Sequence, residues 1–112
     1  MAACNWFREF DFARGARLTG GDPMNGRRVM AQRSCISCHT VPGVPKGNGT
    51  SAPSLAHWSR RSQFLNQYPN TPENMIKWLQ NPSHLKPGTN MPRLNVTDQE
   101  SRDVTAYLFS IN

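Results

Sequence analysis

Residues 35–39 read Cys-Ile-Ser-Cys-His, and this pattern limits the fold more than any other feature of the chain. Two cysteines separated by two residues lie on one turn of helix, where each can form a thioether bond with a haem vinyl group. The histidine that follows directly then lies under the iron. The sequence therefore predicts that Cys35 and Cys38 hold a covalent haem c, that His39 binds its iron, and that the chain folds around this cofactor.

Two other uses of a C-x-x-C pair are open at this point. A zinc site needs a second pair of ligands at suitable spacing, and the remaining candidates, Cys4, His57 and His84, form no such pair. A thioredoxin-like redox pair needs alternating strands and crossover helices, a pattern that this chain does not show. The motif and its surroundings favour haem attachment.

The length and charge of the chain agree with a small haem protein. At 112 residues the chain is one domain at most, and a haem packed in its middle supplies apolar mass that so short a chain lacks. The formal net charge of +6 favours encounter with acidic partners in a salt-dependent way. Nucleic-acid binding is not expected, because the chain has no run of five basic residues and no recognised nucleic-acid motif.

The start of the chain bears on where the protein works. Bacteria attach haem to reduced thiols outside the cytoplasm, so we expect a periplasmic protein or one on the outer face of the cytoplasmic membrane. Residues 1–4, Met-Ala-Ala-Cys, resemble the end of a lipoprotein signal. This makes Cys4 a candidate lipid tether, and the alternative is an ordinary exposed cysteine. No apolar signal region precedes Cys4, and no stretch approaches the length of a membrane span.

Composition divides the chain into an N-terminal extension, residues 1–21, and a domain, residues 22–112. The extension mixes aromatic residues with arginines and ends in two glycines. Its aromatic side chains are expected to pack on the domain or on a partner, so the extension is also a candidate docking segment.

Capping residues predict where three helices of the domain begin. Asp22-Pro23 and Thr71-Pro72 each pair a capping residue with proline at the first helical position, and Thr97 begins a capping box with Glu100. No β pattern appears. The expected helical segments are residues 23 to the cysteine motif, a short piece over 61–68, residues 72–80, and the stretch after residue 97.

This order of helices, motif and loops resembles the class I cytochrome c family over about residues 22–112. Gly26, nine residues before Cys35, is similar to the glycine at which the family's first and last helices touch, here expected near Tyr107. The resemblance implies an all-α cytochrome c fold, with three main helices and long loops wrapped around one covalent haem.

Four further positions extend the resemblance into the haem site. Pro53, in Ala-Pro-Ser-Leu, matches the proline whose carbonyl accepts a hydrogen bond from the proximal histidine. Trp78, in Trp-Leu-Gln-Asn-Pro, stands where the family has tyrosine. Met91, in Pro-Gly-Thr-Asn-Met-Pro, resembles the distal iron ligand. Arg61 resembles the arginine that lies near a haem propionate.

Alternatives stay open at two of these positions. His57 and His84 are the other candidates for the distal ligand, although neither lies in a motif. Arg60 is the other candidate for the propionate contact. The methionines expected to be structural, because they lie on helical stripes, are Met24, Met30 and Met75.

Histidine and methionine ligation leaves the iron no open site, so the resemblance implies one-electron transfer and not an enzyme. We expect a carrier between respiratory or photosynthetic redox partners, such as a quinol-oxidising complex, a dehydrogenase, a terminal oxidase or a reaction centre. The alternative is a fixed haem c subunit or domain of a larger membrane complex, with the extension as its docking element. A haem enzyme or gas sensor with an open distal site is a third option, against which Met91 argues.

Overall fold

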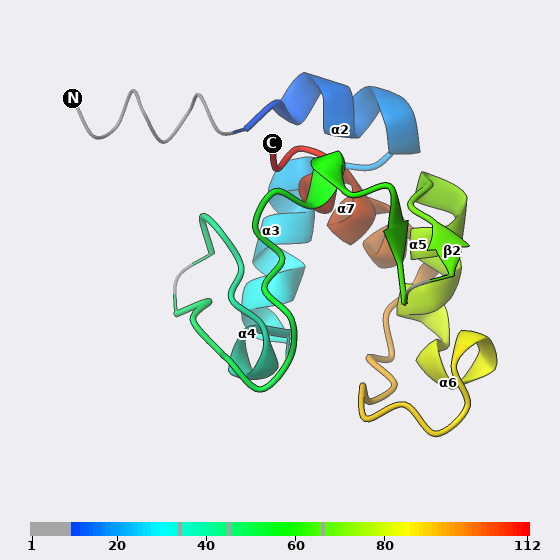
Figure 1. Ribbon diagram of the computed structural model, residues 1–112. Helices are drawn as coiled ribbons and strands as arrows, with labels where there is room; N and C mark the ends of the chain where they lie inside the picture. Colours follow the sequence, from blue (N-terminus) through cyan, green and yellow to red (C-terminus); the bar gives the residue numbers. More distant parts are fainter. Residues whose placement is uncertain (1–9, 34, 45, 66) are drawn as a thin grey trace.

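The computed structural model describes residues 10–33, 35–44, 46–65 and 67–112. In Figure 1, α3 and α7 cross, α5 lies against α7, and α2 lies over the C-terminal end of α7. The elements in chain order are α2 (Phe12–Thr19), α3 (Pro23–Gln32), α4 (Cys35–Cys38), the single 3-10 turn η1 (Trp58–Arg60), β1 (Gln63–Phe64), β2 (Tyr68–Pro69), α5 (Pro72–Gln80), α6 (Pro82–Leu85) and α7 (Asp98–Leu108).

Three helices begin where the sequence predicts, because a side-chain oxygen caps each first turn. Asp22 accepts a hydrogen bond at 3.0 Å from the N–H two residues later, and Thr71 accepts one at 3.2 Å from the N–H three residues later. Thr97 and Glu100 form the predicted capping box, with bonds of 3.0 and 2.9 Å. Helix α3 ends at Gln32, so the cysteine motif forms a turn of its own, α4.

Glycine makes the crossing of α3 and α7 close. A Cβ added at Gly26 would collide with the backbone of Asp103, so only glycine lets the two helix backbones touch here. The sequence predicts this role but places the contact near Tyr107, and the structure puts it about one turn earlier on α7. Gly21, in the link before α3, approaches the backbone of Arg102 in the same way.

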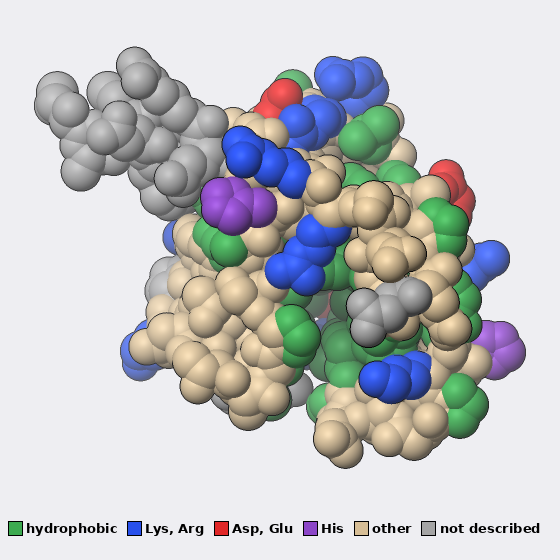
Figure 2. Space-filling model, in the orientation of Figure 1, with side chains coloured by type: hydrophobic (Ala, Val, Ile, Leu, Met, Phe, Trp, Pro, Cys, Tyr) green, Lys and Arg blue, Asp and Glu red, His purple; other side chains and the backbone are tan. Residues whose placement is uncertain are grey.

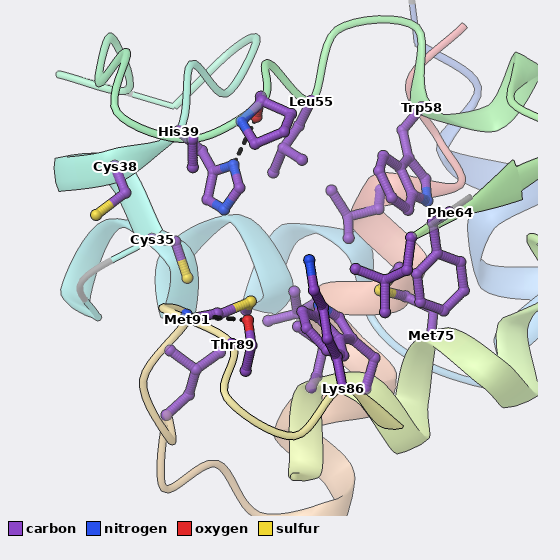
Figure 3. A pocket seen from close by; sticks show the side chains of 18 of the residues that line it. Cys35, Cys38, His39, Leu55, Trp58, Phe64, Met75, Lys86, Thr89 and Met91 are labelled. Atoms are coloured by element: carbon purple, nitrogen blue, oxygen red, sulfur yellow. Dashed lines mark hydrogen bonds between the residues drawn. The ribbon is translucent and has the colours of Figure 1, made fainter. Parts of the chain in front are cut away.

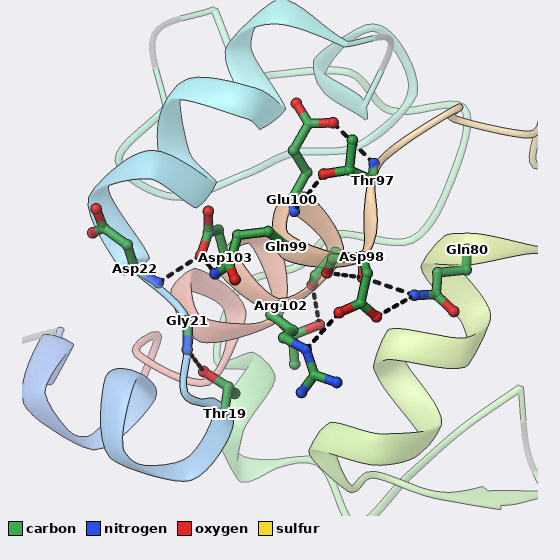
Figure 4. A network of polar contacts seen from close by, with 12 residues as sticks. Thr19, Gly21, Asp22, Gln80, Thr97, Asp98, Gln99, Glu100, Arg102 and Asp103 are labelled. Atoms are coloured by element: carbon green, nitrogen blue, oxygen red, sulfur yellow. Dashed lines mark hydrogen bonds and ion pairs between the residues drawn. The ribbon is translucent and has the colours of Figure 1, made fainter.

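A buried carboxylate ties α7 to the start of α3 (Figure 4). Asp103 is 2 % exposed and accepts hydrogen bonds from the backbone N–H of Asp22 at 2.7 Å, from Asn25 at 2.6 Å and from Gln99 at 2.8 Å. Burial by itself raises the pKa of Asp103, but the three hydrogen bonds outweigh it, and the pKa lies below its usual range. The carboxylate is thus charged in the folded protein and satisfied by N–H donors alone.

The sequence does not predict helix α2, which precedes the expected domain. The Arg14 guanidinium crosses to the end of α7 and donates to the Phe109 carbonyl at 3.1 and 3.0 Å, and to Ser59 Oγ at 3.0 Å. The ring of Phe10 lies 5.8 Å from the ring of Tyr107. The described part of the extension therefore packs on the domain.

Strands β1 and β2 form a short antiparallel hairpin in which Phe64 lies opposite Tyr68. The prediction of a helical piece over 61–68 is therefore wrong. The rings of Phe64 and Tyr68 lie 5.8 Å apart across the hairpin, and Leu65 adopts a left-handed φ of 54° that breaks any helix there. Cross-strand ring contact thus prevails over local helix preference.

Two side chains tie the loop after α4 to the crossed helices. The Tyr107 hydroxyl donates to the Pro42 carbonyl at 2.5 Å, and the Arg27 side chain donates to the Gly43 carbonyl at 2.7 Å. Burial raises the pKa of Tyr107 to about 12, so its hydroxyl keeps the proton that the bond needs. This loop is thus held by α3 and α7 together.

Apart from the hairpin, helix α2 and the single turn α6, which the sequence does not predict, the described residues have the helical architecture that the sequence predicts. Met24 is an exception to the expected packing, because it is 47 % exposed on α3, whereas Met30 and Met75 are buried. Within the described ranges, the structure has no helix of sufficient length and apolar character to cross a membrane.

Candidate functional site

A cavity of about 720 Å³ lies between the α4 segment and the segments that lead from η1 to α7. The face shown in Figure 2 is hollowed at this place, with hydrophobic side chains on the walls and Lys and Arg side chains around the opening. A site of this size and character suits a large, mostly apolar ligand. The apolar side chains that line it include Met30, Leu55, Trp58, Phe64, Leu65, Met75, Trp78, Leu79, Leu94, Val104 and Leu108.

Both cysteines of the motif reach this cavity. Cys35 is buried, Cys38 is half-buried, and neither forms a disulfide. Burial raises the pKa of the Cys35 thiol, although its own backbone N–H and the charge of Arg33 oppose the shift. The structure therefore keeps two reduced sulfur atoms at one edge of an apolar cavity.

His39 follows α4 and projects into the cavity (Figure 3). Its Nδ1 lies 2.6 Å from the carbonyl oxygen of Pro53. A carbonyl only accepts, so Nδ1 carries the proton and Nε2 keeps a free lone pair. Two backbone hydrogen bonds also fix the position of His39. Its N–H donates to the Cys35 carbonyl at 2.9 Å, and its carbonyl accepts from the Gly49 N–H at 3.2 Å. The imidazole is thus fixed in the tautomer that a metal ligand needs.

Met91 faces His39 from the opposite side of the cavity (Figure 3). It is half-buried in the loop that joins α6 to α7, and its N–H donates to Thr89 Oγ1 at 3.2 Å. The two alternative histidines do not line the cavity. His57 instead contacts the carbonyl of Asn112 through Nδ1 at 2.8 Å.

Arg61 and Trp78 also line the cavity. The Arg61 guanidinium lies 5.0 Å from the centre of the Trp58 ring and donates to the carbonyl of Ser54. Arg60, the alternative for the propionate contact, does not line the cavity. Trp78 is 8 % exposed and contributes an indole where a tyrosine would bring a hydroxyl.

Sequence reasoning missed several residues of the site. Lys86 lines the cavity, and its ammonium points toward the middle of it (Figure 3). Lys86 stands directly before the Pro-Gly-Thr segment of the Met91 loop. This position could have identified it as a residue of the site. Trp58 and Phe64 gave no such signal, because they lie in short segments without periodicity.

The donor set fits a covalently attached iron porphyrin. Two thiols lie at one edge, an imidazole nitrogen and a thioether sulfur face each other, and the walls are apolar. In the part of the chain that the structure describes, no three His, Cys, Asp or Glu side chains gather into a metal site. The zinc alternative therefore has no support there, whereas every group that haem c requires is present.

Comparison with known proteins gives a consistent result. The sequence model of the family described as cytochrome c matches residues 23–112. Cytochrome c oxidase subunit 2 of Alkalihalophilus pseudofirmus is 33% identical over 88 residues, which cover 77% of this chain and 25% of that protein. The same oxidase component of Bacillus sp. PS3 is 28% identical over 110 residues, 95% of this chain and 31% of that protein.

A relative of another kind is a component of nitric oxide reductase from Paracoccus denitrificans. It is 26% identical over 86 residues, which cover 76% of this chain and 55% of that protein. The chain thus spans about a quarter to a third of the length of the two oxidase relatives and about half of the reductase relative.

Proposed function

The chain belongs to the cytochrome c family, whose members hold covalent haem c and transfer electrons, and on this premise we propose that His39 and Met91 are its two iron ligands. The observation that carries the proposal is their arrangement. The imidazole, with Nδ1 occupied by the Pro53 carbonyl, faces a thioether across one apolar cavity that has two thiols at its edge.

Each residue has a distinct task in this proposal. Cys35 and Cys38 form the two thioether bonds, and Pro53 orients the imidazole. Arg61 lies where it can pair with a carboxylate of the cofactor, while Trp78 closes the wall without a hydroxyl. When bound, haem supplies reversible one-electron chemistry, at a potential that a methionine ligand raises relative to a second histidine.

We propose redox partners of the respiratory type. The matched relatives are subunits of a terminal oxidase and of nitric oxide reductase, which favours the fixed haem unit over the freely diffusing carrier. A photosynthetic partner has no such relative among these matches. Electron transfer, not catalysis, is the proposed role of this chain, with the basic rim of the cavity turned to an acidic partner.

The proposed location is the outer face of the cytoplasmic membrane or the periplasm, because haem attachment requires it. Cys4, the proposed lipid tether, lies outside the described residues. The docking role of the extension, residues 1–21, is likewise a proposal, and its residues 1–9 lie outside the described residues.

Covalent attachment is tested by acid–acetone extraction of the purified holoprotein. The wild type should keep its haem, and the double variant Cys35→Ala, Cys38→Ala should release all of it. Haem that stays attached to the double variant would disprove the assignment of the motif.

Size-exclusion chromatography of detergent-solubilised native membranes distinguishes a fixed haem subunit from a freely diffusing carrier. A fixed subunit should elute with a complex far larger than this chain and should stay there in high salt. A protein that leaves the membrane fraction in high salt and elutes as a small monomer would identify a carrier instead.

A further inference from the structure

The loop that carries Met91 has few polar ties to the rest of the fold. Within residues 82–96, the hydrogen bonds of the loop are local: they join Lys86 to Pro82, Thr89 to Lys86, and Met91 to Thr89. Among the described residues, one hydrogen bond joins the end of α6, where this loop begins, to a distant element. The Tyr68 hydroxyl on β2 donates to the carbonyl of Leu85, the last residue of α6, at 2.9 Å.

Tyr68 is well placed to act as a fixed point. Its ring packs on Phe64 with centroids 5.8 Å apart, and Phe64 in turn contacts the Trp78 ring at 6.3 Å. Phe64 is 6 % exposed, so the hairpin is anchored in the wall of the cavity. The hydroxyl therefore reaches from a packed element to the start of a loop whose other contacts with distant described residues are apolar, through Leu94 and the half-buried Met91 and Val96.

The neighbourhood of Met91 offers no substitute for this bond. Trp78 stands on the cavity wall without a hydroxyl, and the hydrogen bond of Met91 runs from its backbone to Thr89 in the same loop. The sulfur is thus placed by the loop as a whole. Any opening of the loop at Leu85 moves the sulfur away from the position opposite His39.

We propose that Tyr68 is a positioning residue for the distal ligand, because its bond to Leu85 sets how readily Met91 gives way to an outside ligand. The inference rests on the proposed role of Met91 as the distal ligand. In this proposal the two-strand hairpin has a functional role, because through Tyr68 it controls how readily an outside ligand replaces Met91.

Imidazole binding to the oxidised holoprotein tests this inference, with Tyr68→Phe as the variant. Phenylalanine keeps the ring contact and removes only the hydroxyl, so the far-UV spectrum and the denaturant midpoint should change little. One net hydrogen bond corresponds to a factor of about three to ten in an equilibrium. The affinity for imidazole, measured by the Soret band, should therefore rise by about that factor. Tyr68→Leu, which also removes the ring contact, should raise it at least as much.

Tyr107→Phe is the matched control. It also removes a hydroxyl that donates to a backbone carbonyl, that of Pro42 at 2.5 Å, but this bond holds the loop after α4. The control should leave the imidazole affinity unchanged. Because Tyr107 is fully buried and Tyr68 is half-buried, the control should lower the denaturant midpoint more than Tyr68→Phe does. An equal rise in affinity in both variants would show a general loosening and would overturn the inference, as would wild-type affinity in Tyr68→Phe.

Met91→Ala separates this inference from the proposed function. If Met91→Ala binds imidazole far more tightly than the wild type while Tyr68→Phe does not, the ligand assignment stands and the role of Tyr68 is refuted. If Met91→Ala binds no more tightly than the wild type, Met91 is not the distal ligand and the proposed function loses its ligand set.

Discussion

At the scale of single residues, the two sides of the cavity are held with unequal strength. His39 is fixed through its ring by Pro53 and through its backbone by Cys35 and Gly49. Met91 has one local backbone bond, to Thr89. The His39 side of the cavity is therefore held by more hydrogen bonds than the Met91 side, and under the proposed ligand set we expect ligation to change on the Met91 side.

Replacing Met91 by alanine should expose this difference in the holoprotein. The reduction potential should fall by on the order of 0.1 V, within the range of about 0.8 V that axial ligands set, because the donor that replaces sulfur favours ferrous iron less. Ferrous protein should then bind carbon monoxide rapidly. Met24→Leu, a swap of similar volume at an exposed position of α3 that does not line the cavity, should keep both properties and change stability by less than about 0.5 kcal/mol. An unchanged potential in Met91→Ala would mean that another residue binds the iron.

Asp103 gives a prediction about pH. Its three N–H donors favour the charged form, so Asp103→Asn should lower the free energy of unfolding at neutral pH by about 1–3 kcal/mol. The folded-state pKa is depressed, hence the stabilisation is complete above the unfolded value of about 3.9 and is lost as pH falls through the folded-state pKa. Denaturant titrations of both proteins should therefore converge in acid. A stability gap that persists unchanged to about pH 2, below the unfolded value, would contradict this assignment.

At the scale of elements, α2 and α7 make a close crossing that a single methyl group can probe. Alanine usually stabilises a helix relative to glycine by about 0.5–1 kcal/mol. At Gly15, however, the new Cβ would collide with the backbone oxygen of Ala106 and the hydroxyl of Ser110. Gly15→Ala should therefore destabilise the protein by about 1–3 kcal/mol in thermal unfolding. Ala13→Ser, at an exposed position of α2, should change stability by less than about 0.5 kcal/mol.

If Gly15→Ala is instead neutral or stabilising, α2 does not pack on α7 in solution. The comparison thus tests whether the unit that folds begins before the family match, which starts at residue 23. We propose that it includes at least α2, because the Arg14 side chain bonds to both Phe109 and Ser59.

The parts of the fold that the sequence predicts are those with local causes. The caps at Asp22, Thr71 and Thr97 are each satisfied within three residues, so their helices could be located from the chain alone. Membership of the cytochrome c family is confirmed. The residues brought to the cavity include every expected one, although their roles in binding haem stay predictions.

The parts that the sequence does not predict depend on distant contacts. The hairpin forms because Phe64 is buried between other rings. Helix α2 does carry local signals, the Asp11 cap at its start and the left-handed Gly20 at its end, but its packing on α7 through Gly15 and Arg14 depends on residues about 90 positions later in the chain. Tyr68 shows no motif at all, because its partner Leu85 lies 17 residues later. Periodicity and capping carry no information of this kind.

At the scale of the whole molecule, the cavity occupies the place of a conventional core. The side chains of Met30 on α3, Met75 on α5 and Leu108 on α7 line this cavity, so without cofactor each of the three helices lacks part of its apolar packing. The double variant Cys35→Ala, Cys38→Ala, prepared free of haem, should therefore show no cooperative thermal transition and a large loss of far-UV helical signal. A transition as sharp as that of the holoprotein would show that the side chains suffice as a core.

The distribution of charge also belongs to the whole molecule. Residues 22–61 contain one Asp and no Glu against six Arg and Lys, and Arg61 and Lys86 lie on the cavity itself. Arg33, by contrast, is paired with Glu100 at 3.1 Å, so part of this positive charge is neutralised away from the cavity. An anionic reactant should accordingly be drawn to the opening of the cavity more than to the protein as a whole.

Oxidation of the reduced holoprotein by ferricyanide, a small trianion, measures this attraction. The stopped-flow rate should fall as ionic strength rises from about 0.01 to 0.1 M, because the screening length shortens from about 30 to about 10 Å. Lys86→Glu should lower the rate at low salt several-fold, whereas Lys77→Glu should lower it less, since Lys77 is exposed on α5 and does not line the cavity. Both variants carry the same net charge, so a difference between them reports position and not total charge. Equal rates in the two variants would mean that the charge acts only through the net +6, and the basic rim would then have no part in choosing an acidic partner.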